Sequence, residues 1–196
     1  VLGYNEKFTI FDSDDSLKLI SRCIVKAGYD IKMVSPKSVQ ETISSSKNKL
    51  KDCDSFVKKA FDPFEKIVAS IFPLYQNELY KANTLDFDDL LLLTVKILKL
   101  HLETRKKYQD QFQYILVDEF QDTNSVQNEI ILLLYSGDNK IFVVGDDDQS
   151  IYSWRGAEVS NIINFDKNFS NAMVIKLEQN YRSTSYILDA ANELIK

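Results

Sequence analysis

The stretch Ile115-Leu116-Val117-Asp118-Glu119 is a short apolar run that ends abruptly in two carboxylates. Such a run is typical of a buried strand in a parallel sheet, and α/β proteins place their chemistry just past the carboxyl ends of these strands. The pattern recurs over residues 141–149, where an apolar run precedes a glycine, three aspartates and a glutamine. A third apolar run, Met173-Val174-Ile175, leads through Leu177 to Arg182. Helical patterns separate these runs, which predicts an α/β fold with a parallel sheet and flanking helices.

The three runs carry complementary polar residues at their ends. If the strands lie side by side, they bring Asp118, Glu119, Gln149 and Arg182 to one edge of the sheet. Carboxylates suit Mg²⁺ and an attacking water, whereas glutamine and arginine suit a terminal phosphate. We therefore predict a site for a nucleoside triphosphate. The alternative for each residue is structural, namely an acidic turn that ends a strand, or an arginine at a helix start that pairs with a nearby acid.

A second group of residues follows the second run. Tyr152, Trp154 and Arg155 place two rings and a guanidinium within four residues. Stacking of a nucleobase on such a platform contributes roughly 1–3 kcal/mol per base. The alternative is an aromatic pair in the core, capped by the arginine. Three consecutive acids, Asp146–Asp148, repel one another and are tolerated in solvent or near a cation. They leave open an unrelated Mg²⁺-dependent phosphohydrolase.

The first part of the chain has helical patterns. Asp12 or Ser13 is predicted to cap a first helix, and Ser35 followed by proline is predicted to begin a second. The polar run over residues 44–49 is predicted to be a helix end or a loop. A helix over residues 64–79 contains Pro73, which we expect to kink or split it. Residues 86–100 are apolar almost all round, which predicts a helix buried on several faces.

Composition limits the class of protein. The 196 residues are 44% hydrophobic, enough to bury a core, and their net charge is −5. Residues 1–82 carry 13 Lys and Arg against 11 Asp and Glu, whereas the remainder carries 11 against 18. A protein that binds nucleic acid through charge alone would be basic, so we expect any such contact to be local. Cys23 and Cys53 lack metal-ligand spacing and are predicted to be reduced thiols, buried or half-buried. With no signal segment or membrane span, we expect a soluble, cytoplasmic protein.

Four strings together resemble the superfamily-one DNA helicases of the UvrD, Rep and PcrA type. The strings are Leu85–Leu91, Val117–Thr123, Val144–Ala157 and Asn180–Ser183. Their order and spacing also fit that family. The stretches Phe8–Asp12 and Ile43–Leu50 resemble its helical 1B insertion, so the resemblance covers nearly the whole chain.

The resemblance implies a role for each candidate residue. Asp118 would coordinate Mg²⁺, and Glu119 would activate the hydrolytic water. Gln149 would contact the γ-phosphate of ATP and couple the nucleotide state to the DNA site. Arg182 would bind the γ-phosphate, and Tyr181 would stack near the adenine. The residues implied to line the pockets for single-stranded bases are Phe87, Tyr152, Trp154 and Arg155.

One departure from the family is decisive. The phosphate loop G-x-x-x-x-G-K-[ST] is absent, because none of the five glycines opens such a loop. We therefore expect an internal fragment, with residues 1–82 as the helical 1B-like subdomain. Residues 83–196 would be the C-terminal part of the RecA-like motor domain 1A. Without the loop, the fragment alone is expected neither to hydrolyse ATP usefully nor to unwind DNA.

The expected parent is an ATP-dependent DNA helicase that uses Mg²⁺ and translocates 3′ to 5′ on single-stranded DNA. Its partners would be single-stranded DNA, duplex junctions and the remaining motor domains of the parent chain, with no membrane. Two further readings stay open: a RecB-like helicase–nuclease subunit, and a non-catalytic module that binds single-stranded nucleic acid or a protein partner. The sequence does not indicate a repair or replication pathway, or an oligomeric state.

Overall fold

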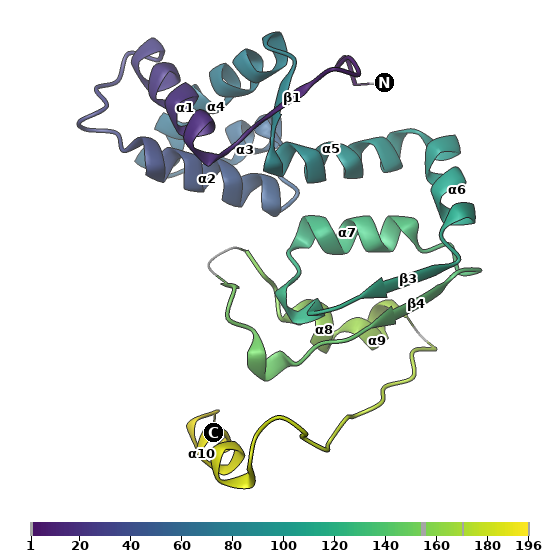
Figure 1. Cartoon of the computed structure of the whole chain (residues 1–196). Coiled ribbons are helices and arrows are strands. Elements are labelled where there is room, and N and C mark those ends of the chain that lie inside the picture. Colours follow the sequence, from purple (N-terminus) through teal and green to yellow (C-terminus); the bar gives the residue numbers. More distant parts are fainter. Residues whose placement is uncertain (1, 154–155, 170, 196) are drawn as a thin grey trace.

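The first part of the fold gathers four helices and two short strands (Figure 1). The computed structural model describes residues 2–153, 156–169 and 171–195. The elements of this first part are β1 (Thr9–Phe11), α1 (Ser13–Lys26), α2 (Pro36–Asn48), α3 (Cys53–Lys59), α4 (Pro63–Lys81) and β2 (Thr84–Asp86). We call this part, residues 9–86, the helical region.

Side-chain caps determine where the helices of this region begin. Asp12 caps α1 by accepting from the backbone N–H of Asp15, and Ser35 caps α2 immediately before a proline, so both predicted starts are confirmed. Gly28 ends the α1 segment with a φ of 86°, a left-handed conformation that suits glycine. The helix α4 runs through Pro73 without a break, so the predicted split does not occur.

The apolar faces of α1, α2 and α4 form one hydrophobic core. Fully buried side chains contribute roughly 1.5–3 kcal/mol each, so this core is the main source of stability in the helical region. Cys23 lies in this core and Cys53 is half-buried at its edge, both as free thiols, as predicted. Burial raises the pKa of Cys53 to about 11 and also raises that of Cys23. Other core members are Ile20, Ile24, Val39, Ile43, Val68, Ile71, Phe72, Tyr75 and Leu79.

The sequence patterns predicted a purely helical region, but the structure also contains two short strands there. Strand β1 pairs in parallel with β2, with Thr9 opposite Thr84. The hydroxyls of these two threonines are hydrogen-bonded at 2.7 Å. This pair ties residues 9–11 to the residues that immediately precede α5 (Phe87–Leu100).

A buried ionic cluster lies where α2 meets the start of α5. Lys47 Nζ is 2.6 Å from Asp86 Oδ2 and 2.7 Å from Asp89 Oδ1. Tyr75 donates its hydroxyl to Asp86 Oδ2 at 2.9 Å. Asp86 and Asp89 also form the capping box of α5, so the same two carboxylates begin that helix and neutralise Lys47. Residues 44–49 form the end of α2, in agreement with the predicted helix end, but Lys47 within them is buried in this cluster.

Opposing effects act on the pKa values in this cluster. Burial alone would lower the pKa of Lys47, but the carboxylates of Asp86 and Asp89 outweigh it and raise the value. Burial would raise the pKa of Asp86, yet Lys47 holds it below its usual range. The pKa of Asp89 is instead raised, by burial and by the neighbouring Asp86. One cation therefore faces two carboxylates, whose pKa values shift in opposite directions.

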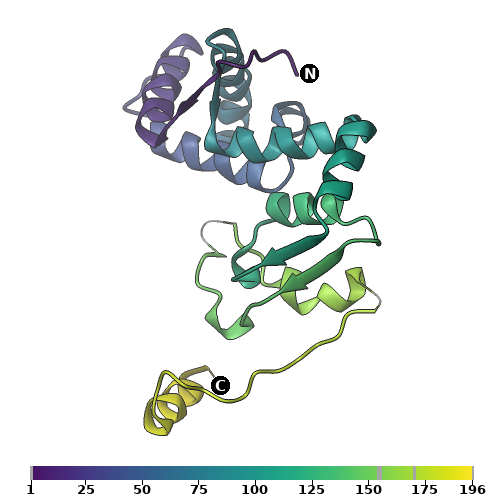
Figure 2. The same cartoon turned by 45° about the vertical axis from the view of Figure 1, so that its right-hand side comes forward.

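The second part of the chain is built around a small parallel sheet (Figure 2). Strand β3 (Tyr114–Val117) pairs with β4 (Lys140–Val143), and α7 (Ser125–Leu134) connects them. This βαβ unit confirms that the first two apolar runs are parallel strands. The remaining elements are α6 (Leu102–Gln111), α8 (Ser160–Ile163), α9 (Phe165–Asn168) and α10 (Ser185–Ile195), with 3₁₀ turns at Phe120–Asp122 and Asp147–Gln149.

The third predicted strand does not form. Residues 171–184 contain no strand, and both views show this segment leading away from the β3–β4 sheet to α10 (Figures 1 and 2). Its apolar side chains are mostly exposed, as Met173 at 84% and Leu177 at 86% illustrate. A strand requires a neighbour to complete its backbone hydrogen bonds, and no described strand pairs with this run. The predicted three-stranded sheet is therefore wrong, because the described residues form two separate two-stranded parallel sheets.

One further prediction concerns membranes. Among the described residues, no helix combines the length and the apolar character that crossing a bilayer requires.

Candidate active site

Asp118 and Glu119 lie immediately beyond the carboxyl end of β3, and both are exposed. Asp118 Oδ1 accepts a hydrogen bond from the backbone N–H of Glu119 at 2.9 Å. Glu119 has a φ of 50°, a left-handed conformation that costs a residue other than glycine about 1–3 kcal/mol. The bend turns the chain from β3 into the 3₁₀ turn at Phe120–Asp122 and leaves both carboxylates at the end of the strand.

A chain of hydrogen bonds joins Glu119 to Gln149. Gln121 Nε2 donates to Glu119 Oε2 at 2.7 Å, and Gln121 Oε1 accepts from the backbone N–H of Asp146 at 3.0 Å. Gln149 Nε2 in turn donates to Asp146 Oδ2 at 2.6 Å. The structure therefore brings the ends of β3 and β4 together, and with them two of the predicted residues, Glu119 and Gln149.

Gln121 is the residue at this site that sequence reasoning missed. Its side chain is only 1% exposed, and both ends of its amide are used. Gly145 makes room for it, because a Cβ at that position would collide with Gln121 Oε1 and with Ile162. The sequence features that could have indicated this residue were its place two residues after Glu119 and the glycine, Gly145, that follows the next strand. Neither feature identifies a partner without the fold.

The structure does not bring Tyr181 and Arg182 to this group. Tyr181 is 93% exposed, Arg182 is also exposed, and both belong to the segment that leads away from the sheet (Figure 1). Asn180 Oδ1 accepts from the backbone N–H groups of Arg182 and Ser183 at 2.8 Å each, which forms a turn before α10. The predicted meeting of Arg182 with Glu119 and Gln149 is absent because the preceding strand has no partner.

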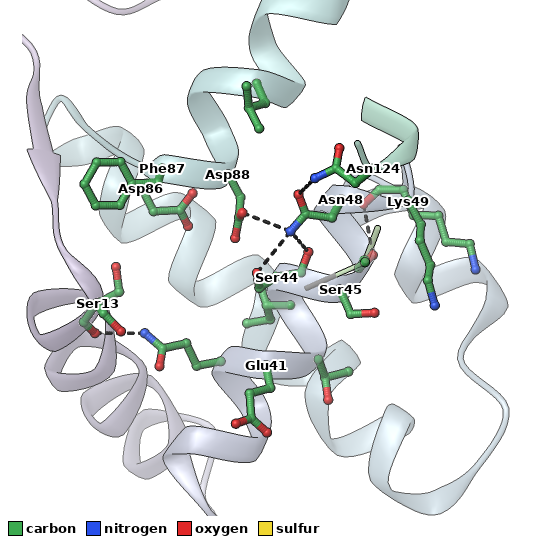
Figure 3. A pocket seen from close by; sticks show the side chains of 18 of the residues that line it. Ser13, Glu41, Ser44, Ser45, Asn48, Lys49, Asp86, Phe87, Asp88 and Asn124 are labelled. Atoms are coloured by element: carbon green, nitrogen blue, oxygen red, sulfur yellow. Dashed lines mark hydrogen bonds between the residues drawn. The ribbon is translucent and has the colours of Figure 1, made fainter. Parts of the chain in front are cut away.

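Two of the residues predicted to bind nucleic acid, Phe87 and Tyr152, lie at a separate cavity. Phe87, the first residue of α5, and Tyr152 both line a cavity of about 1250 Å³ that lies between the helical region and the loops after β3 and β4 (Figure 3). Phe87 is 60% exposed and Tyr152 is 37% exposed, so neither ring is a core residue. Trp154 and Arg155 lie outside the described residues.

Polar and apolar residues line this cavity together. Asp122 is among them, and its Oδ1 is buried without a hydrogen-bond partner in the part of the chain that the structure describes. Such an atom can accept a hydrogen bond from a ligand. Side chains that line the cavity with hydroxyl, amide or ammonium groups include Ser44, Asn48, Lys49, Lys51, Asn124 and Gln127. Rings beside polar groups suit a ligand with flat apolar faces and polar edges.

Asp118 is also the predicted ligand for Mg²⁺. Over residues 2–153, 156–169 and 171–195, no group of three or more His, Cys, Asp or Glu side chains is placed to hold a metal ion. Mg²⁺ nevertheless binds commonly through one or two carboxylates together with water and substrate phosphates. The exposed Asp118 carboxylate at a strand end fits that mode of binding.

Comparisons with known proteins agree with these motifs. Residues 1–170 match the UvrD/REP helicase N-terminal domain. Over 195 residues, the chain is 45% identical to "ATP-dependent DNA helicase PcrA" of Bacillus subtilis, covering 100% of the chain and 26% of that protein. It is 42% identical over 194 residues to the PcrA of Leuconostoc citreum, covering 99% of the chain and 26% of that protein. The chain spans about a quarter of the length of these relatives, and it belongs to the UvrD/REP helicase family, in the N-terminal domain of that family.

Proposed function

We propose that this chain is part of an ATP-dependent DNA helicase, in which it supplies one side of the nucleotide site and part of the strand-binding surface. The observation that carries the proposal is the hydrogen-bonded chain from Glu119 through Gln121 and Asp146 to Gln149. It links a candidate water-activating carboxylate to a candidate phosphate sensor. The cavity lined by Phe87 and Tyr152 gives the strand a place to bind in the same part of the molecule.

On the nucleotide side, the proposed roles follow the chemistry of each group. Asp118 holds Mg²⁺, Glu119 orients and deprotonates the attacking water, and Gln149 contacts the γ-phosphate of ATP. In the complete protein, Arg182 binds the γ-phosphate and Tyr181 stacks near the adenine. Mg²⁺ supplies charge neutralisation at the phosphates when bound. The protein groups fix the water and report whether the γ-phosphate is present.

On the strand side, bases stack on Phe87 and Tyr152, joined by Trp154 and Arg155. The chain has a net charge of −5, so this contact depends on rings and local polar groups rather than on a basic surface. Nucleotide-dependent closure then moves the strand by one step, with 3′ to 5′ polarity, and opens duplex DNA at a junction. The polarity rests on the family alone.

The proposed division of the chain falls at residue 82, shortly before the end of the helical region. Residues 1–82 form the helical 1B-like subdomain, and residues 83–196 form the later part of motor domain 1A. The sequence contains no phosphate loop to cradle the β- and γ-phosphates. The chain by itself is therefore inactive as an ATPase and as a helicase, and the complete protein supplies the missing groups.

The direct test of this function is ATP hydrolysis by the complete protein that carries this chain. We expect hydrolysis that requires Mg²⁺ and increases when a single-stranded oligonucleotide is added, and no turnover from the isolated chain. Phosphate release measured with and without the oligonucleotide checks both statements. Absence of stimulation in the complete protein, or stimulated turnover by the chain alone, would contradict the proposal.

Replacement of Phe87 by alanine tests the strand-binding surface. A stacked base contributes roughly 1–3 kcal/mol, so the variant should bind a single-stranded oligonucleotide about 5- to 150-fold more weakly. Fluorescence anisotropy of a labelled oligonucleotide with the complete protein measures this change. Phe61→Ala is the matched control, because Phe61 is 86% exposed and is not one of the residues that line the cavity. Equal binding by the two variants would exclude Phe87 from the surface.

A further inference from the structure

Asn48, the last residue of α2, contacts three different parts of the molecule through one amide. Its Nδ2 donates to Ser44 O within α2 at 3.0 Å and to Asp88 Oδ1 of α5 at 3.0 Å. Its Oδ1 accepts from Asn124 Nδ2 at 2.8 Å. Figure 3 shows this group at the wall of the cavity, with Asn48 between Asp88 and Asn124.

The partners of Asn48 are adjacent to the residues of the proposed site. Asp88 follows Phe87 in the first turn of α5. Asn124 closes the segment that begins at Asp118, and it caps α7 by accepting from the backbone N–H of Gln127 at 2.9 Å. The Asn124 side chain thus uses its oxygen for the helix cap and its nitrogen for Asn48.

The backbone of Gly156 also approaches Asn48. A Cβ at Gly156 would lie 3.7 Å from Asn48 Cβ, and Gly156 adopts a φ of 84°. The residues after it are held to the same place, because Ala157 forms an antiparallel bridge with Asn124. The backbone N–H of Glu158 donates to Thr123 O at 2.9 Å. The loop that carries Tyr152 therefore ends against Asn48 and Asn124.

An amide is needed at this position because it must donate and accept at the same time. Removing it leaves Asp88 with one acceptor unpaired and Asn124 with one donor unpaired in a partly buried setting. Both residues would then lose one of the contacts that hold α5 and the N-terminus of α7 against α2. The change would affect how these elements are oriented more than it affects the core, which lies elsewhere in α1, α2 and α4.

We propose that Asn48 is a positioning residue that holds Phe87 and the Tyr152 loop in register with the Asp118–Glu119 segment, so that strand binding at the cavity reaches the hydrolytic site. The inference rests on the proposed function and deepens it. It assigns to the helical region a role in coupling the two sites, through one side chain that lines the cavity and acts by holding Asp88 and Asn124.

The test compares Asn48→Ala with the wild type in the complete protein. The half-saturating concentration of a single-stranded oligonucleotide for stimulation of ATP hydrolysis should rise about tenfold, the size typical of a coupling between two sites. Gln109→Ala is the matched control, since Gln109 Nε2 donates to Leu133 O at 2.9 Å and so ties the opposite end of α7. That control should leave the half-saturating concentration unchanged and should lower the melting temperature as much as Asn48→Ala does.

A double-variant cycle separates coupling from a general loss of structure. If Asn48 acts through Asn124, then Asn124→Ala in the Asn48→Ala background should add little further change in half-saturation. Should Asn48→Ala melt below the assay temperature, Asn48→Ser retains a hydroxyl that is too short to reach both partners, and it replaces the alanine variant throughout. The inference would be overturned if Asn48→Ala had the same half-saturating concentration as the Gln109→Ala control. It would also be overturned if the changes in half-saturating concentration caused by Asn48→Ala and Asn124→Ala added fully in the double variant. A wild-type protein without oligonucleotide stimulation would instead refute the proposed function, and this inference with it.

Discussion

Replacement of Glu119 by glutamine in the complete protein should nearly abolish ATP turnover while nucleotide binding persists. A positioned general base typically contributes roughly 10²- to 10⁴-fold to the rate, and glutamine cannot accept the proton from water. The substitution keeps the size of the side chain and an oxygen that can still accept from Gln121 Nε2, which donates to Glu119 at 2.7 Å. The loss should therefore fall on kcat, measured by steady-state phosphate release, with the affinity for a fluorescent ATP analogue unchanged.

The control for this experiment is Glu103→Gln, a matched change at an acid in the first turn of α6, apart from the loops after β3 and β4. It should retain the wild-type kcat. A Glu119→Gln protein that turns over ATP within a few-fold of the wild type would remove Glu119 from the proposed mechanism. In that case Asp118 or the Asp146–Asp148 group would have to supply the base.

The second large effect is expected at Lys47. Lys47→Met removes the cation that compensates Asp86 and Asp89, and leaving buried charge unpaired costs about 3–5 kcal/mol. We expect the free energy of unfolding of this chain, measured by urea denaturation, to fall by that amount. Lys49→Met is the matched control, since Lys49 is exposed. A surface change of this kind should stay within about 0.5 kcal/mol of the wild type.

We also expect Lys47→Met to change how the stability of the folded chain depends on pH. The pKa of Lys47 is raised above its ordinary value of 10.5 in the folded state, so its contribution is complete below that pH. This contribution is lost as the pH rises from 10.5 through the folded-state value. The wild type should therefore lose stability at alkaline pH more steeply than Lys47→Met. Tyr75, whose pKa is also raised, chiefly by burial, adds a loss of the same sign to both proteins.

A second substitution tests whether unpaired carboxylate charge causes the loss of stability in Lys47→Met. Asp89→Asn in the Lys47→Met background removes the carboxylate whose pKa is already raised, while an amide can still serve the capping box of α5. This double variant should recover part of the lost stability. If Lys47→Met unfolds at the same urea concentration as the wild type, the cluster has no net stabilising role.

Local patterns were sufficient to predict much of the fold. Asp12 and Ser35 begin helices because a side-chain oxygen can reach the backbone two or three residues on, and this is encoded within one turn. The runs that became β3 and β4 are short, apolar and joined by one helix, so their pairing is also nearly local. The meeting of Glu119 with Gln149 followed from that pairing.

The remaining features depend on partners that are distant in the sequence. Lys47 falls in a polar run that favours a solvated helix end, and only Asp86 and Asp89, about forty residues on, explain its burial. No local sequence pattern predicts the contacts of Asn48 and Gln121. Residues 173–177 have the composition of a strand, and their apolar side chains favour burial. Composition does not determine which strand such a segment pairs with, and these side chains are mostly exposed in the structure.

The left-handed backbone at Glu119 lowers folding stability at the residue whose carboxylate the proposed ATP hydrolysis requires. With a φ of 50°, the backbone at this position is strained by the Cβ of Glu119, a strain that glycine would not have. The carboxylate that the proposed chemistry requires is therefore held at a thermodynamic disadvantage. Selection for a more heat-resistant protein would favour losing this side chain, and only selection for turnover would retain it.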